Sequence, residues 1–313
     1  MKSNHEAVGK RIWLLLFAFM LLFSLSACTT NVNNNSDTNE VVVYYANKSG
    51  NPDIFSINLA SEEIFQLTDD PAYDDSPALS PDGSMILFLS SRNDPDPHFP
   101  DLKYDIYRMD IKGENLLQLT NTPQAEDHPA WSPDGTQFLF DADYDEDGFY
   151  ELYKMDADGN NLTRLTFNAA NDQFADWSPD GTQIAFSSDR NGNWDIFLMD
   201  ANGNNQQQIT DSIDWELFPA WSPDGKWIAY NGLAPRSRNT DVFIMSAVGN
   251  NIQQLTDAPG FDENPVWTAS GEQILFQSTM DGNFNIYCIN KDGSNLHKIT
   301  SISGDELWPS TGH

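Results

Sequence analysis

Apolar residues along most of this chain occur in short runs of adjacent positions, separated by polar phrases. In one representative unit the runs are QIAFSS at 183–188, DIFLMD at 195–200, QQQIT at 206–210 and FPAWS at 218–222. Adjacent β-branched and aromatic residues predict strands covered on both faces, so the first two runs should lie between sheets. The more polar QQQIT suits an outer strand with an exposed edge. Each unit therefore predicts four strands.

The same unit recurs along the chain. The phrase SPDG starts at Ser80, Ser132, Ser178 and Ser222, and a degraded copy, TASG, starts at Thr268, with spacings of 44 to 52 residues. SPDG is turn chemistry, because Pro fixes one φ angle, Asp can bond to its own backbone and Gly tolerates the exit geometry. A Leu-Thr or Ile-Thr pair ends at Thr68, Thr120, Thr166, Thr210, Thr256 and Thr300.

Six units of four antiparallel strands predict an all-β, six-bladed β-propeller. An open β-sandwich would supply as many strands, but nothing in a sandwich requires six equal periods. The first unit, from VVVYY at 41–45, lacks an innermost strand, and the chain ends with ELWPS at 306–310. We expect residues 306–310 to pair beside residues 41–45 and close the ring.

The stretch WSPDGTQIAFSSDRNGNWDIFLMD, from Trp177 to Asp200, resembles the propeller repeat of the translocation protein TolB family. That WD40-like repeat is shared with the non-catalytic propellers of dipeptidyl peptidase IV-like enzymes. The resemblance covers residues 41–313 and implies a scaffold, gate or docking surface. We expect no amino-terminal α/β domain of the TolB type, since the repeats start almost at the tether, and no hydrolase domain after them.

The N-terminus has the composition of an export signal. Lys10 and Arg11 precede the apolar run IWLLLFAFMLLF at 12–23, which is short for a membrane span and fits a signal-peptide core. The following LSAC, ending at Cys28, resembles the bacterial lipobox, in which the cysteine is acylated. We expect a signal peptide at 1–27, a flexible tether at 28–40 and the propeller at 41–313, anchored outside the cytoplasm on the periplasmic side or the cell surface. An uncleaved anchor with an incidental cysteine is the alternative.

The net charge limits the kinds of molecule that this chain can bind, and the cysteine content limits disulfide formation. Lys and Arg number 16 against 47 Asp and Glu, a formal net charge of -31, so nucleic acid would be repelled. The acidic surface serves either solubility alone or attraction for cations or a basic protein face. Cys288, within NIYCIN, should be a buried and inert strand residue without a disulfide partner.

One loop resembles a calcium site. In DADYDEDGFYE, at 141–151, Asp143, Asp145, Asp147 and Gly148 reproduce the start of a calcium-binding loop, although Lys154 stands where the twelfth-position acid belongs. The sequence therefore predicts possible Ca²⁺ binding, with a solvated acidic hairpin as the alternative. No cofactor is otherwise required.

Catalytic motifs are scarce in the sequence. It contains no G-x-S-x-G, H-E-x-x-H or glycine-rich phosphate loop. His98 and His128 could approach each other beside Glu126 and Asp127, which leaves a metal-dependent, glycan-active lyase or hydrolase as the alternative. We expect no enzyme, and a monomeric propeller that docks an envelope or secreted protein, or a cell-surface ligand.

An acid lies six residues after every Leu-Thr or Ile-Thr pair. This position should mark the crossing to the next innermost strand, so the six carboxylates are expected to ring one channel mouth on the face of the long loops. The structural alternative is that each carboxylate accepts hydrogen bonds and ties neighbouring blades together. The six acids are Asp74, Glu126, Asp172, Glu216, Asp262 and Glu306.

Overall fold

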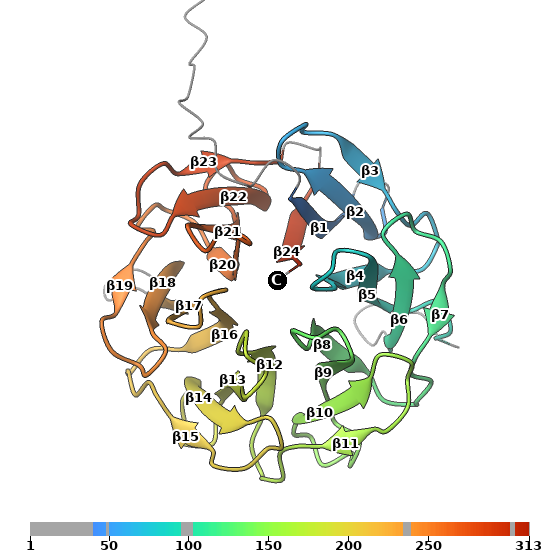
Figure 1. Cartoon of the computed structure of the whole chain (residues 1–313), viewed down its shortest axis with the longest axis horizontal. Coiled ribbons are helices and arrows are strands. Elements are labelled where there is room, and N and C mark those ends of the chain that lie inside the picture. The colour runs from blue at the N-terminus through green and yellow to red at the C-terminus, as the bar shows by residue number, and fades with distance from the viewer. Residues whose placement is uncertain (1–39, 48–49, 95–102, 234–238, 301–303, 313) are drawn as a thin grey trace, which may run out of the picture. The chain divides into compact units, whose positions relative to one another are not determined.

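The strands of the chain form six four-stranded antiparallel sheets arranged radially around a channel (Figure 1). The computed structural model describes residues 40–47, 50–94, 103–233, 239–300 and 304–312. Every regular element assigned within these residues is a strand. The predicted all-β, six-bladed propeller is confirmed.

The first three blades share one strand order from the channel outward. Blade 1 consists of β24 (Glu306–Thr311), β1 (Val41–Ala46), β2 (Asp53–Asn58) and β3 (Ile64–Gln66). Blade 2 consists of β4 (Asp74–Leu79), β5 (Met85–Ser90), β6 (Asp105–Asp110) and β7 (Leu117–Gln118). Blade 3 consists of β8 (Glu126–Trp131), β9 (Gln137–Ala142), β10 (Glu151–Asp156) and β11 (Thr163–Arg164).

The other three blades have the same order. Blade 4 consists of β12 (Asp172–Trp177), β13 (Gln183–Ser188), β14 (Asp195–Asp200) and β15 (Gln207–Gln208). Blade 5 consists of β16 (Glu216–Trp221), β17 (Trp227–Leu233), β18 (Thr240–Ser246) and β19 (Gln253–Gln254). Blade 6 consists of β20 (Asp262–Trp267), β21 (Gln273–Ser278), β22 (Asn285–Asn290) and β23 (His297–Lys298).

The two middle strands of each blade are buried on both faces, as their adjacent apolar residues predict. In β13 and β14 five of six residues are buried. The apolar core lies between neighbouring blades: Leu87 and Ile106 of blade 2 pack with Phe138 and Tyr153 of blade 3. A blade cannot bury these side chains alone, so the closed ring supplies the apolar contacts that stabilise each sheet.

The SPDG turns are held by one repeated set of hydrogen bonds. The Ser80 hydroxyl donates to Asp82 at 2.7 Å and accepts the Met85 N–H at 2.9 Å. Gly83 has φ 69°, a left-handed conformation that glycine adopts without strain. The same contacts recur at Ser132, Ser178 and Ser222.

The ring closes by joining the two ends of the propeller. β24 pairs antiparallel with β1, with Ala46 opposite Glu306 and Val43 opposite Ser310. The Thr311 hydroxyl donates to the Trp267 carbonyl at 2.7 Å, and Ser310 accepts the Leu79 N–H at 3.0 Å. The predicted closure by residues 306–310 is confirmed, and β24 contacts both neighbouring blades.

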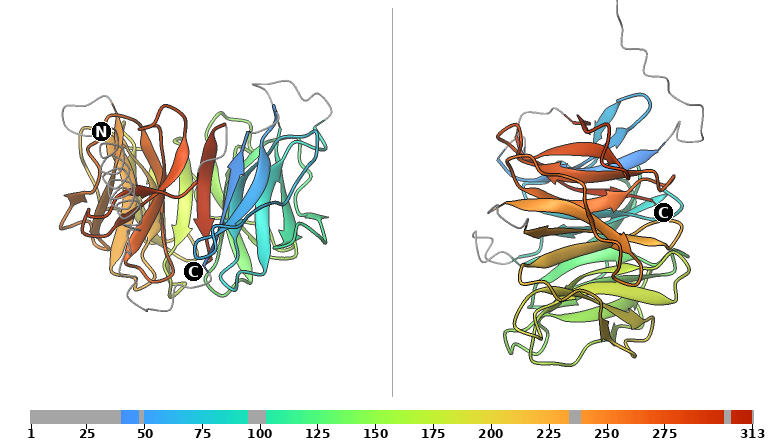
Figure 2. Two further views of the ribbon diagram at one scale, coloured as in Figure 1. Left: turned by 90° about the horizontal axis from the view of Figure 1, so that it is seen from above. Right: turned by 90° about the vertical axis from the view of Figure 1, so that its left-hand side faces the viewer.

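The strands run between two faces of the propeller (Figure 2). SPDG joins the first and second strands of a blade, so these turns lie on one face, which we call the turn face. The connections between the second and third strands, and the crossings to the next blade, lie on the opposite face, which we call the loop face. Each innermost strand therefore begins at the loop face and ends at the turn face.

Candidate functional site: the central channel

The repeated threonine before each blade crossing holds the strand beside it. In all six blades its hydroxyl accepts the N–H of the second residue of the third strand or, in β18, of the third residue, at 2.7 to 3.0 Å. Thr120 and Thr300 also donate to Glu126 at 2.8 Å and Glu306 at 2.6 Å. The six-residue spacing from threonine to acid thus reflects a contact between an outer crossing and the next innermost strand.

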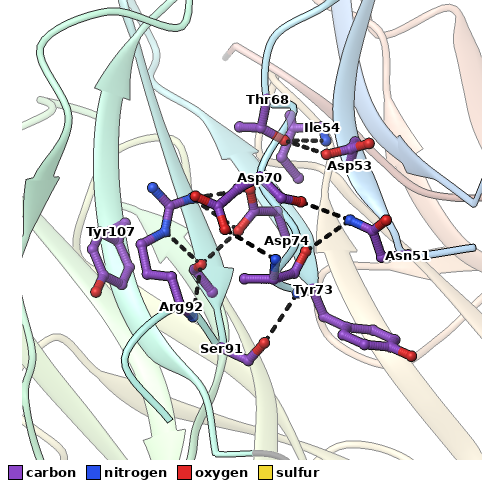
Figure 3. Close-up of polar contacts among 12 residues, drawn as sticks. Asn51, Asp53, Ile54, Thr68, Asp70, Tyr73, Asp74, Ser91, Arg92 and Tyr107 are labelled. Atoms are coloured by element: carbon purple, nitrogen blue, oxygen red, sulfur yellow. Dashed lines mark hydrogen bonds and ion pairs between the residues drawn. The ribbon is translucent and has the colours of Figure 1, made fainter. Parts of the chain in front are cut away.

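In two blades an arginine completes this contact. Arg92 donates to both oxygens of Asp74 at 2.9 Å, and Arg190 donates to both oxygens of Asp172 at 2.7 Å. Figure 3 shows Arg92 beside Asp74, with its guanidinium also over the ring of Tyr107. Burial raises the pKa of Asp74, and the bonds from Ser90 and Arg92 oppose that rise. Bidentate pairs of this kind fix geometry as well as charge.

Glu126 is held by uncharged donors instead. It accepts hydrogen bonds from Thr120, Thr122 and Tyr144, at 2.6 to 2.8 Å. Burial raises the pKa of Glu126 to about 7, and the three hydroxyls oppose that rise. Burial also raises the pKa of Glu216 and of Asp262.

The six acids are therefore interior residues of the blades. Their exposed fractions are 0 to 6%, and none of them lines the cavity in the channel. Five of them also donate their backbone N–H to a carbonyl of the preceding blade, at 2.8 to 3.1 Å. The burial of all six acids, and the side-chain hydrogen bonds of Asp74, Glu126, Asp172 and Glu306, match the structural alternative, whereas neither carboxylate oxygen of Asp262 has a hydrogen-bond partner among the residues that the structure describes. The expected ring of carboxylates at the channel mouth is not found, because these side chains are buried within the blades.

The channel is lined instead by the residue two positions after each acid. At that point every innermost strand bulges, and its pairing with the second strand shifts register. The bulge gives each of these residues a left-handed backbone, with φ between 45° and 57°. The six residues, which we call the collar, are Ser76, His128, Phe174, Phe218, Asn264 and Trp308.

Four collar residues form a closed circuit of rings across the channel. Ring centroids lie 4.4 Å apart for His128 and Phe174, and 4.0 Å apart for Phe174 and Phe218. Trp308 lies 5.3 Å from Phe218 and 5.1 Å from His128. The two longer distances are within the range of about 4.5 to 7 Å for favourable aromatic pairs, and the two shorter ones lie just below it. Collar residues from all six blades border a cavity of about 180 Å³.

Carboxylates surround the imidazole of the collar. His128 Nδ1 lies 3.0 and 3.2 Å from the two oxygens of Asp141, which is fully buried. Burial lowers the pKa of His128, but Asp141, Asp127 and Asp75 raise it to about 9. Burial and Asp127 together raise the pKa of Asp75 to about 7. A cationic imidazole thus lies among several carboxylates beside an apolar wall.

Three of these groups are close enough to share a cation. Ligand atoms of Asp127, His128 and Asp141 all lie within 4.8 Å of one another, the one such group among the described residues. Imidazole with carboxylate ligands suits a transition metal better than calcium. However, His128 Nδ1 already bonds to Asp141, and Asp141 also accepts the Gln173 amide at 3.0 Å.

The predicted calcium loop is not arranged around a single point. Asp143 accepts the backbone N–H groups of Asp147 and Gly148, at 3.1 and 3.0 Å. The carboxylate of Asp145 pairs with Arg164, which also lies 3.0 Å from Glu151. The three aspartates therefore serve turn and ion-pair contacts, and calcium binding stays a prediction.

Some of the other residues singled out in the sequence belong to the described part of the chain and some do not. Cys28 and His98 lie outside the described residues, as do the predicted signal peptide and all of the tether except Glu40. Cys288 is buried and free, and burial raises its pKa to about 12. Among the described residues no helix is long and apolar enough to cross a membrane.

Comparison with protein families identifies the repeat. The model of the TolB beta propeller domain matches residues 144–234 and 216–311, which together make up more than half of the chain. This chain belongs to the TolB beta propeller domain family. The resemblance expected from residues 177–200 is confirmed.

Solved structures share the fold of this TolB-type propeller. TolB from Acinetobacter baumannii is 22% identical with a TM-score of 0.75, and the match covers 88% of this chain and 67% of that one. A putative TolB from Agrobacterium tumefaciens is 20% identical with a TM-score of 0.68, covering 88% and 91%. An oligogalacturonate lyase from Vibrio parahaemolyticus is 13% identical with a TM-score of 0.58, covering 84% and 80%. At these identities the likeness concerns the fold alone.

One curated relative has a short match. The uncharacterized protein Atu1656 of Agrobacterium fabrum is 28% identical over 102 residues. The match spans 32% of this chain and 35% of that relative.

Sequence reasoning identified the acids and missed the collar. When the six units are aligned, the position before the Pro or Ala of the innermost strand changes from Ser to His, Phe, Asn or Trp, while an acid stands two residues earlier in every unit. That variation, between a repeated acid and a Pro or Ala, was the available signal.

Proposed function

We propose that this protein is a lipid-anchored, extracytoplasmic propeller that docks an envelope or secreted protein, or a cell-surface ligand, at its central channel. The collar carries the proposal. Non-glycine residues hold a left-handed backbone at all six positions, which is energetically unfavourable for L-amino acids. Four of the six positions carry ring side chains although glycine would relieve the strain, which favours a role for the side chains themselves.

The side chains that line the cavity indicate which kind of ligand would bind there. Phe174, Phe218 and Trp308 offer apolar ring faces. His128 and Asp176, whose pKa is raised to about 7 by burial, add ionisable groups to the same lining. Small-molecule and peptide sites commonly combine apolar walls with a few placed polar groups. An apolar or aromatic group that carries a neighbouring cation fits this combination, because carboxylates outnumber the single imidazolium. Association should then weaken as salt rises.

The proposed location rests on the sequence before the propeller. The charged start, the apolar run at 12–23 and the LSAC that ends at Cys28 together favour export and acylation. An anchored propeller would present its channel to other molecules of the envelope. A docking role needs no catalytic group, and the channel offers no activated nucleophile among the described residues.

Affinity capture of the tethered protein from its own membranes tests the docking role. A Phe174→Ala, Trp308→Ala double variant should lose the captured partner, because it removes two faces of the ring circuit. Phe65→Ala is the matched control, since Phe65 is also aromatic, is 57% exposed and lies on the outer strand β3. A melting curve of each variant separates lost docking from lost folding.

Two results would contradict the proposal. One is partner capture that survives in a folded double variant. The other is cleavage of a polysaccharide in the presence of added Mn²⁺ or Ca²⁺ that His128→Gln abolishes, which would favour the glycan-active alternative.

The anchor is tested separately by mass spectrometry of the mature N-terminus. A lipidated Cys28 is expected, and Cys28→Ser should release the protein from the membrane. An intact Met1, or cleavage elsewhere with a soluble product, would argue against the anchor without affecting the channel.

A further inference from the structure

Three equivalent grooves lie on the turn face, each between two neighbouring blades. Each is bordered by one SPDG turn of the first blade, the tryptophan and SPDG turn of the next, and an alanine directly after the third strand of that next blade. The alanines are Ala157 between blades 2 and 3, Ala201 between blades 3 and 4, and Ala247 between blades 4 and 5. The grooves can therefore be compared position by position.

In two of the grooves a cationic side chain crosses to the next blade. Arg108, the fourth residue of β6, donates from Nη1 to the Ala157 carbonyl at 2.5 Å. Lys154, the fourth residue of β10, donates from Nζ to the Ala201 carbonyl at 2.9 Å. Both residues border the grooves that they cross.

In the third groove the equivalent residue is Leu198, the fourth residue of β14. Leucine cannot donate a hydrogen bond, and within the described part of the chain the Ala247 carbonyl receives no such bond from a side chain. The groove is correspondingly larger, at about 560 Å³, against 390 and 480 Å³ for the grooves that hold Arg108 and Lys154. We call it the open groove.

The open groove combines apolar side chains with polar ones, among them Gln183 and Gln207. Leu198, Trp221 and Val248 border it, and Val248 is 70% exposed. Asp180 and Asp224 of the two SPDG turns lie at its edges, and Asp224 is paired with Lys226 at 2.8 Å. Hydrogen bonds from Ser178 and Thr182 hold the pKa of Asp180 below its usual value, so this carboxylate is charged at neutral pH.

We propose that the open groove docks a partner segment that carries a lysine or arginine beside an aliphatic residue. The cation would donate to the Ala247 carbonyl, as Arg108 and Lys154 do within this chain at the equivalent alanines. Its stem and the aliphatic neighbour would cover Leu198 and Val248. The formal charge of -31 and the carboxylate of Asp180 at the edge favour a basic segment over an acidic one.

A defined peptide tests the inference on the full chain purified in detergent. The probe is N-acetyl-Leu-Lys-Leu-amide, with N-acetyl-Leu-Glu-Leu-amide as the charge control. Methyl NMR of Val248 and Ile209, which both border the groove, reports binding there. We expect the lysine peptide to shift both methyl groups in the millimolar range or below, and the glutamate peptide to bind at least tenfold more weakly.

Two substitutions close and open grooves without touching the channel. Leu198→Arg places the crossing cation of blade 2 into the open groove and should reduce lysine-peptide affinity at least tenfold, whereas Leu198→Ile should keep it. Arg108→Leu should open the groove between blades 2 and 3, so that the lysine peptide then also shifts the Met85 methyl group, which borders it. This gain of binding does not depend on a loss that misfolding could mimic.

Three outcomes would overturn the inference. They are the absence of shifts with the lysine peptide, equal binding of the two peptides, and unchanged binding in a folded Leu198→Arg variant. Concentration-dependent self-association of the chain that Leu198→Arg abolishes would assign the groove to a second copy instead of a separate partner. Because the groove is on the turn face, the collar variants should leave peptide binding unchanged, which separates this inference from the docking role of the channel.

Discussion

Two positions on each innermost strand, separated by a single residue, behave in opposite ways. The first is a buried acid in every blade, and in four blades its carboxylate accepts hydrogen bonds from hydroxyl or guanidinium donors. The second is the collar residue, which borders the channel cavity and differs in chemistry from blade to blade. The constant spacing of the acids within the chain marks a structural contact, while the variable collar marks the surface that a ligand would meet.

The difference has a physical cause. An ion pair or hydrogen-bonded carboxylate inside the protein tolerates little change, because removal of one partner leaves the other buried without compensation. A collar residue faces a cavity, so its size and polarity can change while the strand keeps its bulge. Repetition within a propeller therefore points to the fold, and departures from repetition at constrained positions point to function.

The largest expected effect comes from removal of β24, which supplies both an acid, Glu306, and a collar residue, Trp308. Deletion of residues 305–313 exposes the edge of β1 and removes the bonds from Thr311 and Ser310 to neighbouring blades. We expect the free energy of unfolding to fall by on the order of 5 kcal/mol, which corresponds to a melting temperature at least about 10 °C lower. Scanning calorimetry measures it, and an unchanged melt would show that closure contributes little.

The next largest effect distinguishes the buried acid of blade 4 from its collar residue by the stability that each substitution removes. Asp172→Ala leaves Arg190 without its bidentate partner and should destabilise the protein by about 3 kcal/mol. Phe174→Gly, two residues later, removes a collar ring but suits a φ of 57°, so the free energy of unfolding should change by less than about 1 kcal/mol. Urea denaturation compares them. Equal losses of stability would break the distinction between structural acid and ligand-facing collar.

A smaller effect concerns the pH dependence of Glu126. Its pKa is raised to about 7 in the folded protein, above the unfolded value, so its protonated form is favoured by folding. This contribution is fully present below pH 4.5 and is lost as pH rises through about 7. Between pH 5 and pH 8 the free energy of unfolding of the wild type should fall by about 2 kcal/mol more than that of Glu126→Gln. The difference between the two proteins removes the titration of the other buried acids, and parallel pH curves would show that Glu126 does not titrate in this range.

The smallest expected effect is calcium binding at the predicted site of Asp143, Asp145 and Asp147. Arg164 holds Asp145, so an ion would have to displace this pair. Calorimetry should detect heat only at millimolar calcium, with Asp145→Ala abolishing it and Arg164→Gln increasing affinity. If the wild type gives no heat, the loop is a solvated hairpin, and equal heats in wild type and Asp145→Ala would move the site elsewhere.

Much of the fold could be predicted because the same turn and strand sequences recur in each unit and act over short distances along the chain. The SPDG turns bond within six residues, from Ser80 to Met85, and the paired apolar runs require cover on both faces. Ring closure by residues 306–310 followed from counting strands. The acids lie beside the blade crossings, as predicted. Their side chains are buried within the blades and do not face the channel mouth. Which way a side chain points depends on the fold of the strand around it and cannot be taken from the spacing alone.

The sequence by itself determined the six units, their turns, the inner and outer strands and the joining of the two ends. The tertiary structure alone decided which residues face the channel and which grooves stay open. The register shift that turns Phe174 into the cavity arises from the pairing of β12 with β13, and the open groove at Leu198 depends on a carbonyl 49 residues away in the next blade. Both depend on contacts between segments distant in sequence, which a local pattern of polar and apolar residues does not encode.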